Sequence, residues 1–162
     1  MSGDSLFEQH VVHAMVVPDE RSMIEACHKR FAASFEAAHI DGWVAIAVDS
    51  EDQGHAFKPA SRCWLLEMGR NSQAFLREQH DYRFLQAPSA RDAIATLRKE
   101  MPGWHIDSVV DVDRLAHERG WRLTRSEADA LPDMCQVARY IRFDRMAPAL
   151  PLLEAMGGVS KD

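Results

Sequence analysis

The sequence has few cysteines, no cluster of basic residues and no long apolar run. Its three cysteines, Cys27, Cys63 and Cys135, are odd in number and widely spaced, a pattern that predicts free thiols in a reducing compartment. The net charge is -6 and the arginines are scattered, so we expect no nucleic-acid partner. No apolar run approaches the ~20 residues that cross a bilayer. We therefore expect no membrane association and a cytoplasmic location.

Strong catalytic signatures are also missing from the sequence. We find no GxGxxG, P-loop, HExxH or GxSxG pattern, and these motifs would have indicated dinucleotide, nucleotide, zinc-protease or hydrolase chemistry. The composition is 46% hydrophobic and 27% charged, which is typical of an ordinary soluble domain. The sequence therefore predicts a globular fold but specifies no reaction.

Two short motifs occur twice along the chain. His-Ile-Asp stands at 39–41 and again at 105–107, and Glu-Gln-His stands at 8–10 and again at 78–80. Pro18 and Pro88 follow the two Glu-Gln-His motifs at the same offset. Two copies about 66 to 70 residues apart indicate a duplication rather than an array of many short repeats.

Each copy has the same predicted order of elements. A β-rich run, at 10–17 or 80–87, ends at a proline, and Asp19 or Ser89 then stands where a helix N-cap is wanted. An amphipathic helix follows, and then a strand that alternates apolar and polar residues from His-Ile-Asp onward, as far as Asp113 in the second copy. A glycine-containing turn and a short strand complete each copy.

These patterns predict an α+β fold built from two fused strand–helix–strand–strand repeats. We expect approximate two-fold symmetry, with the helices packed on a mainly antiparallel sheet. The expected boundaries are 1–60 for the first repeat, 61–125 for the second and 126–162 for a C-terminal extension of short helix, strand and short helix, all in one compact unit.

The second repeat contains a strand that the first repeat lacks. The apolar run at 62–69 precedes the second Glu-Gln-His, whereas the first repeat begins almost at its own. The later β-rich run at 137–143 could supply the missing strand. Otherwise the first repeat would keep an open sheet edge, which proteins usually pair or cover. We therefore expect self-association as a homodimer, or a protein partner.

Residues 62–124 resemble a bacterial family known as domain of unknown function 1543, and 7–57 resemble it more weakly through the repeat. The similarity lies in "LLEMGR", in Glu78-x-His80-Asp81 and in "HIDS" followed by "VVDVD". Family members are similar in having duplicated α/β units, with Gly-Gly where this chain has Met68-Gly69. The resemblance implies a fold and a bacterial origin, and it implies no activity.

Histidine and aspartate pairs are the sharpest candidates for chemistry. Residues i and i+2 of a strand share a face, so each His-Ile-Asp projects an imidazole beside a carboxylate. Two histidines with one carboxylate can bind zinc or non-haem iron, and an oriented imidazole can act as a general base. The same pairs can also serve only to fix strand ends. The candidate metal ligands are His10, His39 and Asp41 in the first copy, and His80, His105 and Asp107 in the second.

Three functions are compatible with these features. The first is a non-enzymatic interaction or oligomerisation module, for which no cofactor is expected. The second is a metal-binding protein or metal-dependent enzyme that uses the repeated histidine and aspartate sets. The third is a small-ligand-binding protein with a cleft between the repeats, lined by Trp43 and Trp104.

Overall fold

The computed structural model describes residues 11–32, 38–50, 60–74, 78–127 and 130–146. The chain divides into two compact units. Unit 1 comprises Met1–Gly42 and Ala138–Asp162, and unit 2 comprises Trp43–Val137. The predicted α+β class is confirmed, since the described residues form three α-helices and small antiparallel sheets. The predicted boundaries at 60/61 and 125/126 stay a prediction, because the division reflects packing and not ancestry.

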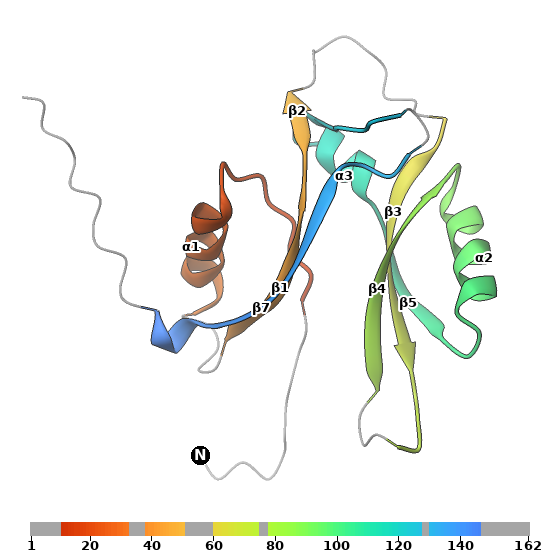
Figure 1. Cartoon of the computed structure of the whole chain (residues 1–162), viewed down its shortest axis with the longest axis horizontal. Helices are drawn as coiled ribbons and strands as arrows, with labels where there is room; N and C mark the ends of the chain where they lie inside the picture. The colour runs from red at the N-terminus through yellow and green to blue at the C-terminus, as the bar shows by residue number, and fades with distance from the viewer. Residues whose placement is uncertain (1–10, 33–37, 51–59, 75–77, 128–129, 147–162) are drawn as a thin grey trace, which may run out of the picture. The chain divides into compact units, whose positions relative to one another are not determined.

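A three-stranded antiparallel sheet forms the centre of unit 2 (Figure 1). Strand β3 (Arg62–Arg70) lies between β4 (Gln79–Ala87) and β5 (His105–Asp111). Strands were predicted at 62–69 and 80–87, and both are confirmed. The central strand is the one without a counterpart at the start of the first repeat.

Helix α2 (Ala90–Glu100) covers one face of this sheet. Ser89 is its N-cap, as predicted, and accepts a hydrogen bond from the Asp92 amide at 3.2 Å. The buried residues of the helix pack on alternate residues of β3, which share a face because a strand has a period of two. The residues buried in this cluster are Trp64, Leu66, Met68, Ala87, Ala93 and Leu97.

The opposite face of β3 is covered at one end only. Cys63 is fully buried there against α3 (Val112–His117) and β6 (Trp121–Leu123). Strand β6 pairs antiparallel with β2 (Val48–Ser50). The other end of this face carries polar residues and no helix of the described chain.

The strand predicted to continue as far as Asp113 is shorter than expected. Strand β5 ends at Asp111, whose carboxylate accepts a hydrogen bond from the Arg114 amide at 2.9 Å and so caps α3. Because of this cap, the chain enters a helix at Val112, and the strand ends two residues before its predicted end at Asp113. Asp113 was expected on a polar strand face but is instead buried, with 3% exposure.

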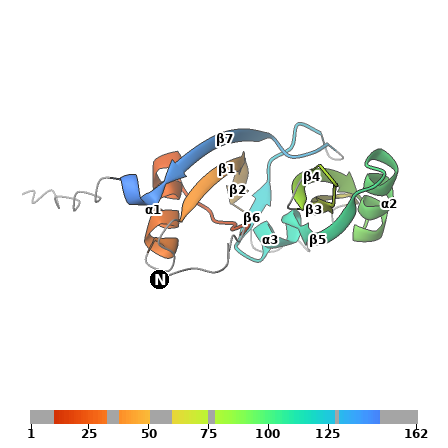
Figure 2. The ribbon, with the colours of Figure 1, turned by 90° about the horizontal axis from the view of Figure 1, so that it is seen from below.

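Unit 1 contains a helix and one end of a two-stranded ribbon, whose residues 43–46 and 134–137 belong to unit 2. Helix α1 (Glu20–Phe31) begins at the predicted N-cap Asp19, which accepts from the Ser22 amide at 2.8 Å. Strand β1 (His39–Ile46) pairs with β7 (Met134–Arg142), so the later strand does pair with the first repeat (Figure 2). A 3₁₀ turn, η1 (Phe143–Arg145), follows β7.

Several predicted elements of the first repeat and the extension are not found. The strand predicted at 10–17 is wrong for 11–17, which have no regular structure because no described strand pairs with them. No helix occurs in the described part of 126–133. The short strand at 55–58 and the tail helix beyond 146 lie outside the described residues. The order helix–strand recurs as α1–β1 and α2–β5, but the duplication and its two-fold symmetry remain predictions.

None of the helices in the described ranges combines the length and apolarity that a membrane crossing requires.

Candidate functional site

The helix-free face of the three-stranded sheet places two histidines on either side of a glycine. Gly69 of β3 lies directly opposite His80 of β4 on one side and directly opposite His105 of β5 on the other. Residues opposite each other in antiparallel strands have their Cα atoms roughly 4.5–5.5 Å apart. The two imidazoles therefore stand on the two sides of a residue that has no side chain.

Two carboxylates join these imidazoles. Glu78 Oε1 lies 2.7 Å from His105 Nε2, and Glu78 Oε2 lies 3.5 Å from His80 Nε2. Asp107 Oδ1 lies 3.2 Å from His105 Nε2, and Asp107 Oδ2 lies 3.9 Å from His80 Nε2. Each carboxylate thus reaches both imidazoles. We call these four side chains over Gly69 the Gly69 cluster.

A register shift in the β3–β5 ladder aims Asp107 into the cluster. Met68 pairs with Ile106 and Glu67 pairs with Ser108, so Asp107 is an extra residue with no partner across the ladder. Such bulges redirect a side chain and recur beside functional sites. The shift leaves His105 and Asp107 close enough to contact each other, as the i, i+2 spacing predicted.

The absence of a side chain at position 69 is required for this convergence. A Cβ built on Gly69 would lie 2.5 Å from His105 Nε2, 2.7 Å from Asp107 Oδ2 and 2.8 Å from Glu78 Oε1. These distances are shorter than any normal contact of a carbon with nitrogen or oxygen. Glycine therefore forms the floor of the cluster.

A second polar group lies two residues further along the same face. Glu67 lies between Tyr82 and Ser108, which are its partners in the two ladders. The Tyr82 hydroxyl donates to Glu67 Oε1 at 3.0 Å and the Ser108 hydroxyl donates to Oε2 at 2.9 Å. Because both of its oxygens accept hydrogen bonds, Glu67 has no need of an ion. Chemistry on this face is therefore concentrated at the Gly69 cluster.

The structure brings together the second predicted ligand set and describes two members of the first. His80, His105 and Asp107 meet in the cluster, whereas in the first copy His39 Nε2 lies 3.2 Å from Asp41 Oδ1 and the His39 ring packs against Tyr140 at 4.6 Å. His10 lies outside the described residues. Within the described ranges, the side chains as they stand include no group of three or more His, Cys, Asp or Glu that could hold a metal ion.

Two members of the cluster, Glu78 and Gly69, were not predicted from the sequence. Glu78 belongs to the repeated Glu-Gln-His and directly precedes β4, so its position two residues before His80 was a usable signal. Gly69 gave no signal by itself, because its role depends on strand pairing that brings together positions 11 and 36 residues away. Pairing across a sheet cannot be read from the local pattern.

The cleft between the repeats, lined by Trp43 and Trp104, stays a prediction. Trp104 packs against the α2 core cluster, and the Arg70 guanidinium lies over its ring, 4.8 Å from the centroid. A shallow hollow on the described part of unit 1 includes neither Trp43 nor Trp104. Its lining residues are Glu20, Arg21, Ile24, Glu25, Arg139 and Met146.

Asp113 forms a buried polar network with the Cys63 amide and Arg125, and this network holds elements of the fold together. Asp113 accepts from the Cys63 amide at 2.6 Å and from Arg125 Nη2 at 2.5 Å. It therefore ties α3 to β3 and to the chain after β6. Burial, with the Asp113 carboxylate nearby, raises the pKa of the Cys63 thiol to about 12. A thiol in this state is an inert core group and not a nucleophile.

Comparison with known proteins gives one match. The family described as Domain of Unknown Function (DUF1543) matches residues 75–123. No curated protein and no solved structure matches the chain. The matched segment runs from the end of the β3–β4 connection to β6 and contains all four side chains of the Gly69 cluster. Residues 75–123 of the chain are therefore similar to this family, whose activity is unknown.

Proposed function

We propose that the protein is a non-enzymatic self-associating module, and that two copies join along strand β7. The observation that carries this proposal is the open edge of β7, whose residues 138–142 lie in a unit that buries little apolar surface. The proposal gives unit 1 the packing that its own described residues do not supply.

The scarcity of buried side chains in unit 1 is the first support. The fully buried hydrophobic residues of the described chain lie in unit 2, with the exception of Phe143. Helix α1 buries none of its twelve residues. Large apolar side chains of unit 1 remain exposed instead: Val11, Val12, Val16 and Tyr140. Burial of apolar surface is the main term that offsets chain entropy, so this unit gains from a partner.

The edge of β7 is the second support. β7 is nine residues long and pairs only with β1 among the described strands. A ribbon of two strands is marginal in water, whereas three or more strands, or packing on a helix, give independent stability. Pairing β7 with β7 of a second copy would produce a four-stranded sheet in the order β1–β7–β7–β1.

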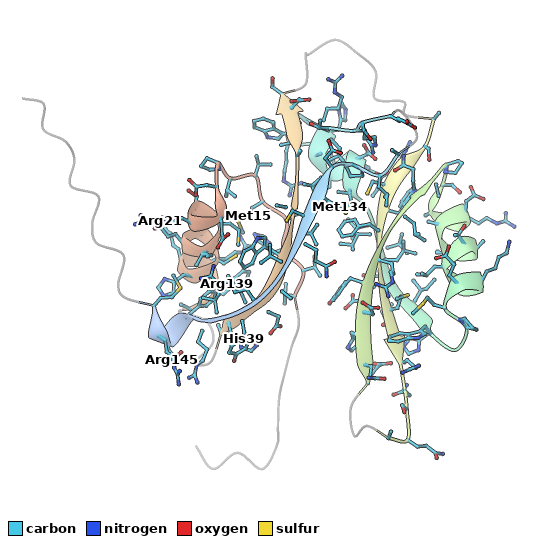
Figure 3. The ribbon with its side chains drawn as sticks, viewed as in Figure 1. Met15, Arg21, His39, Met134, Arg139 and Arg145 are labelled. Atoms are coloured by element: carbon cyan, nitrogen blue, oxygen red, sulfur yellow. The ribbon has the colours of Figure 1, made fainter. Side chains whose placement is uncertain are left out.

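The charges of β7 do not oppose this pairing. Proteins protect open edges with charged side chains and prolines, but β7 contains no proline and its two arginines already have acidic partners. Arg139 projects toward α1 and contacts Glu20 at 2.7 Å (Figure 3), and Arg142 contacts Asp144. The arginines therefore offer less repulsion to an incoming strand than free cations would.

A two-fold axis through the middle of β7 gives the most complete pairing. Antiparallel self-pairing centred on Ala138 places Cys135 opposite Ile141, Gln136 opposite Tyr140, and Val137 opposite Arg139. No arginine then faces another arginine. In this register the two Ala138 residues face each other.

This register can be tested by charge complementation at Ala138. Sedimentation equilibrium of the wild-type chain with a chelator present is expected to show a concentration-dependent dimer. Ala138→Asp and Ala138→Lys should each weaken the dimer at least tenfold, because like charges directly opposite destabilise a strand pair. An equimolar mixture of the two variants should restore it.

Ala95→Asp is the matched control, since Ala95 is an exposed alanine on α2 of unit 2. It should leave the association constant unchanged. A wild-type chain that stays monomeric at every concentration would refute the proposal. So would an Ala138→Asp variant that associates as well as the wild type.

A further inference from the structure

We propose that the Gly69 cluster is a binding site for one divalent transition-metal ion, with zinc as the reference ion. Its ligands would be Glu78 and His80 from one side of β3, and His105 and Asp107 from the other. This site is independent of the β7 edge on which self-association rests.

The donor set has the chemistry of a transition-metal site. Imidazole nitrogens and carboxylate oxygens are the usual ligands of zinc after thiolate, at about 2.0–2.2 Å from the ion. Two imidazoles with two carboxylates would balance the charge of a divalent ion. The same set suits zinc, cobalt or nickel better than calcium, which prefers a shell made only of oxygen.

The distances between the donors are close to those that a metal imposes. Ligand atoms in a tetrahedral zinc shell lie about 3.3 Å apart, from the bond lengths above. In the cluster the four nitrogen–oxygen distances run from 2.7 to 3.9 Å. These distances, each to a different carboxylate oxygen, lie on both sides of the spacing in a metal shell.

The donors pair with one another in the structure, so the site is not preformed. The contact of His105 with Glu78 at 2.7 Å is too short to be kept in a tetrahedral shell. As they stand, no group of the described side chains could hold a metal ion, so binding requires side chains of the cluster to move. The four side chains are between 33% and 48% exposed, so a rotation of Glu78 is enough to admit an ion and to open its path from solvent.

Gly69 explains why such a site is possible on a flat sheet. His80 and His105 lie on opposite sides of β3. Their rings can approach a common ion only because the residue between them, Gly69, has no side chain. Any larger residue at position 69 would overlap three of the four ligands. Alanine at this position would therefore disrupt the site without removing any ligand.

Calorimetric titration of the chelator-treated protein with zinc tests the proposal. Wild type is expected to bind one zinc ion per chain. Single changes His80→Gln and His105→Gln should weaken binding at least tenfold, and the double variant should abolish it. Gly69→Ala should weaken binding by about 10–100-fold, as disturbance of ligand positioning does in other metal sites.

His39→Gln is the matched control, because His39 also stands two residues before an aspartate on a strand and contacts that carboxylate at 3.2 Å, but it lies on β1, outside the Gly69 cluster. It should bind zinc as the wild type does. Circular dichroism of each metal-free variant checks that the fold persists. Absence of zinc binding by the wild type would overturn the proposal, as would binding that the double histidine variant retains.

The Ala138→Asp variant separates this proposal from self-association. It should bind zinc with wild-type stoichiometry even as a monomer. A loss of zinc binding on loss of the dimer would contradict the placement of the site within one chain.

Discussion

Individual side chains of unit 2 have environments that set their reactivity. Cys63 is fully buried and its thiol pKa is raised to about 12, first by burial and then by the nearby Asp113 carboxylate. Cys135 lies exposed on β7. The three free thiols predicted from the sequence are therefore chemically unequal.

This difference predicts selective labelling. A thiol reagent at pH 8 should modify Cys135 in the folded protein and leave Cys63 intact, because Cys63 is neither ionised nor accessible. Mass spectrometry of the labelled peptides identifies the site. Equal labelling rates at the two positions would show that β3 is not buried as described.

The same pKa predicts a loss of stability at high pH. The thiol of the unfolded chain ionises near its ordinary value of 9.0, whereas the folded thiol stays protonated up to about 12. The protonated Cys63 thiol therefore contributes fully to the free energy of unfolding below pH 9. This contribution is lost progressively as the pH rises toward 12. Denaturant titrations should show a shallower loss in Cys63→Ala, and an identical pH dependence in that variant would contradict the assignment.

Substitution of the buried Asp113 should lower the free energy of unfolding more than most single substitutions in this chain. Asp113→Asn leaves Arg125 facing a neutral group in an interior site, and loss of one partner of a buried pair costs about 3–5 kcal/mol in the free energy of unfolding. Asp49→Asn is a suitable control, because Asp49 is exposed and accepts one hydrogen bond from Thr124. Urea unfolding measures both, and equal small effects would argue against the network.

At the scale of elements, the two long helices have similar caps but unequal packing. Asp19 and Ser89 each accept a hydrogen bond from the amide three residues on. Helix α2 buries Ala93 and Leu97, whereas α1 buries no residue. The same kind of N-cap residue therefore begins two helices that contribute unequally to the buried core.

This contrast predicts different effects of removing the two caps. Ser89→Ala should lower the global free energy of unfolding by about 1 kcal/mol, because α2 belongs to the main core. Asp19→Ala should loosen α1 with a smaller effect on global unfolding. Chemical denaturation measures the first, and hydrogen exchange of the α1 amides measures the second. A larger global loss from Asp19→Ala would contradict the packing of α1.

Elements with strong local signals were predictable from the sequence, and those that depend on partners were not. The caps at Asp19 and Ser89, the strand at the apolar run 62–69 and the strand at the β-rich run 80–87 were predicted correctly because they follow from neighbouring residues. The strand predicted at 10–17 was wrong for 11–17, because its apolar pattern needs a paired strand. The early start of α3 was missed, because a capping carboxylate at Asp111 also fits an alternating strand.

The candidate site shows the same limit. The i, i+2 spacing correctly paired His105 with Asp107, but it paired His39 with Asp41 equally well. Only the order of strands β4–β3–β5 places His80 and His105 on both sides of Gly69. The local motif is the same in both copies. The pairing of strands is what distinguishes the Gly69 cluster from the contact between His39 and Asp41.

At the scale of the whole molecule, the two units differ in how much apolar surface they bury. Unit 2 contains both buried clusters of the described chain, while unit 1 exposes apolar side chains and part of the edge of β7. Self-association along that edge would give unit 1 a partner. Pairing centred on Ala138 also specifies which residues of the two copies face each other.

Disulfide cross-linking across the proposed axis tests this claim most directly. In a Cys135→Ser background, Ala138→Cys should give a disulfide-linked dimer on mild oxidation, because residues facing each other in antiparallel strands lie within the reach of a disulfide. Gln136→Cys should give none, since its two copies would lie about 13 Å apart along the strands. Non-reducing electrophoresis reads both outcomes. No cross-link at position 138, or an equal one at 136, would contradict the pairing of β7 with itself.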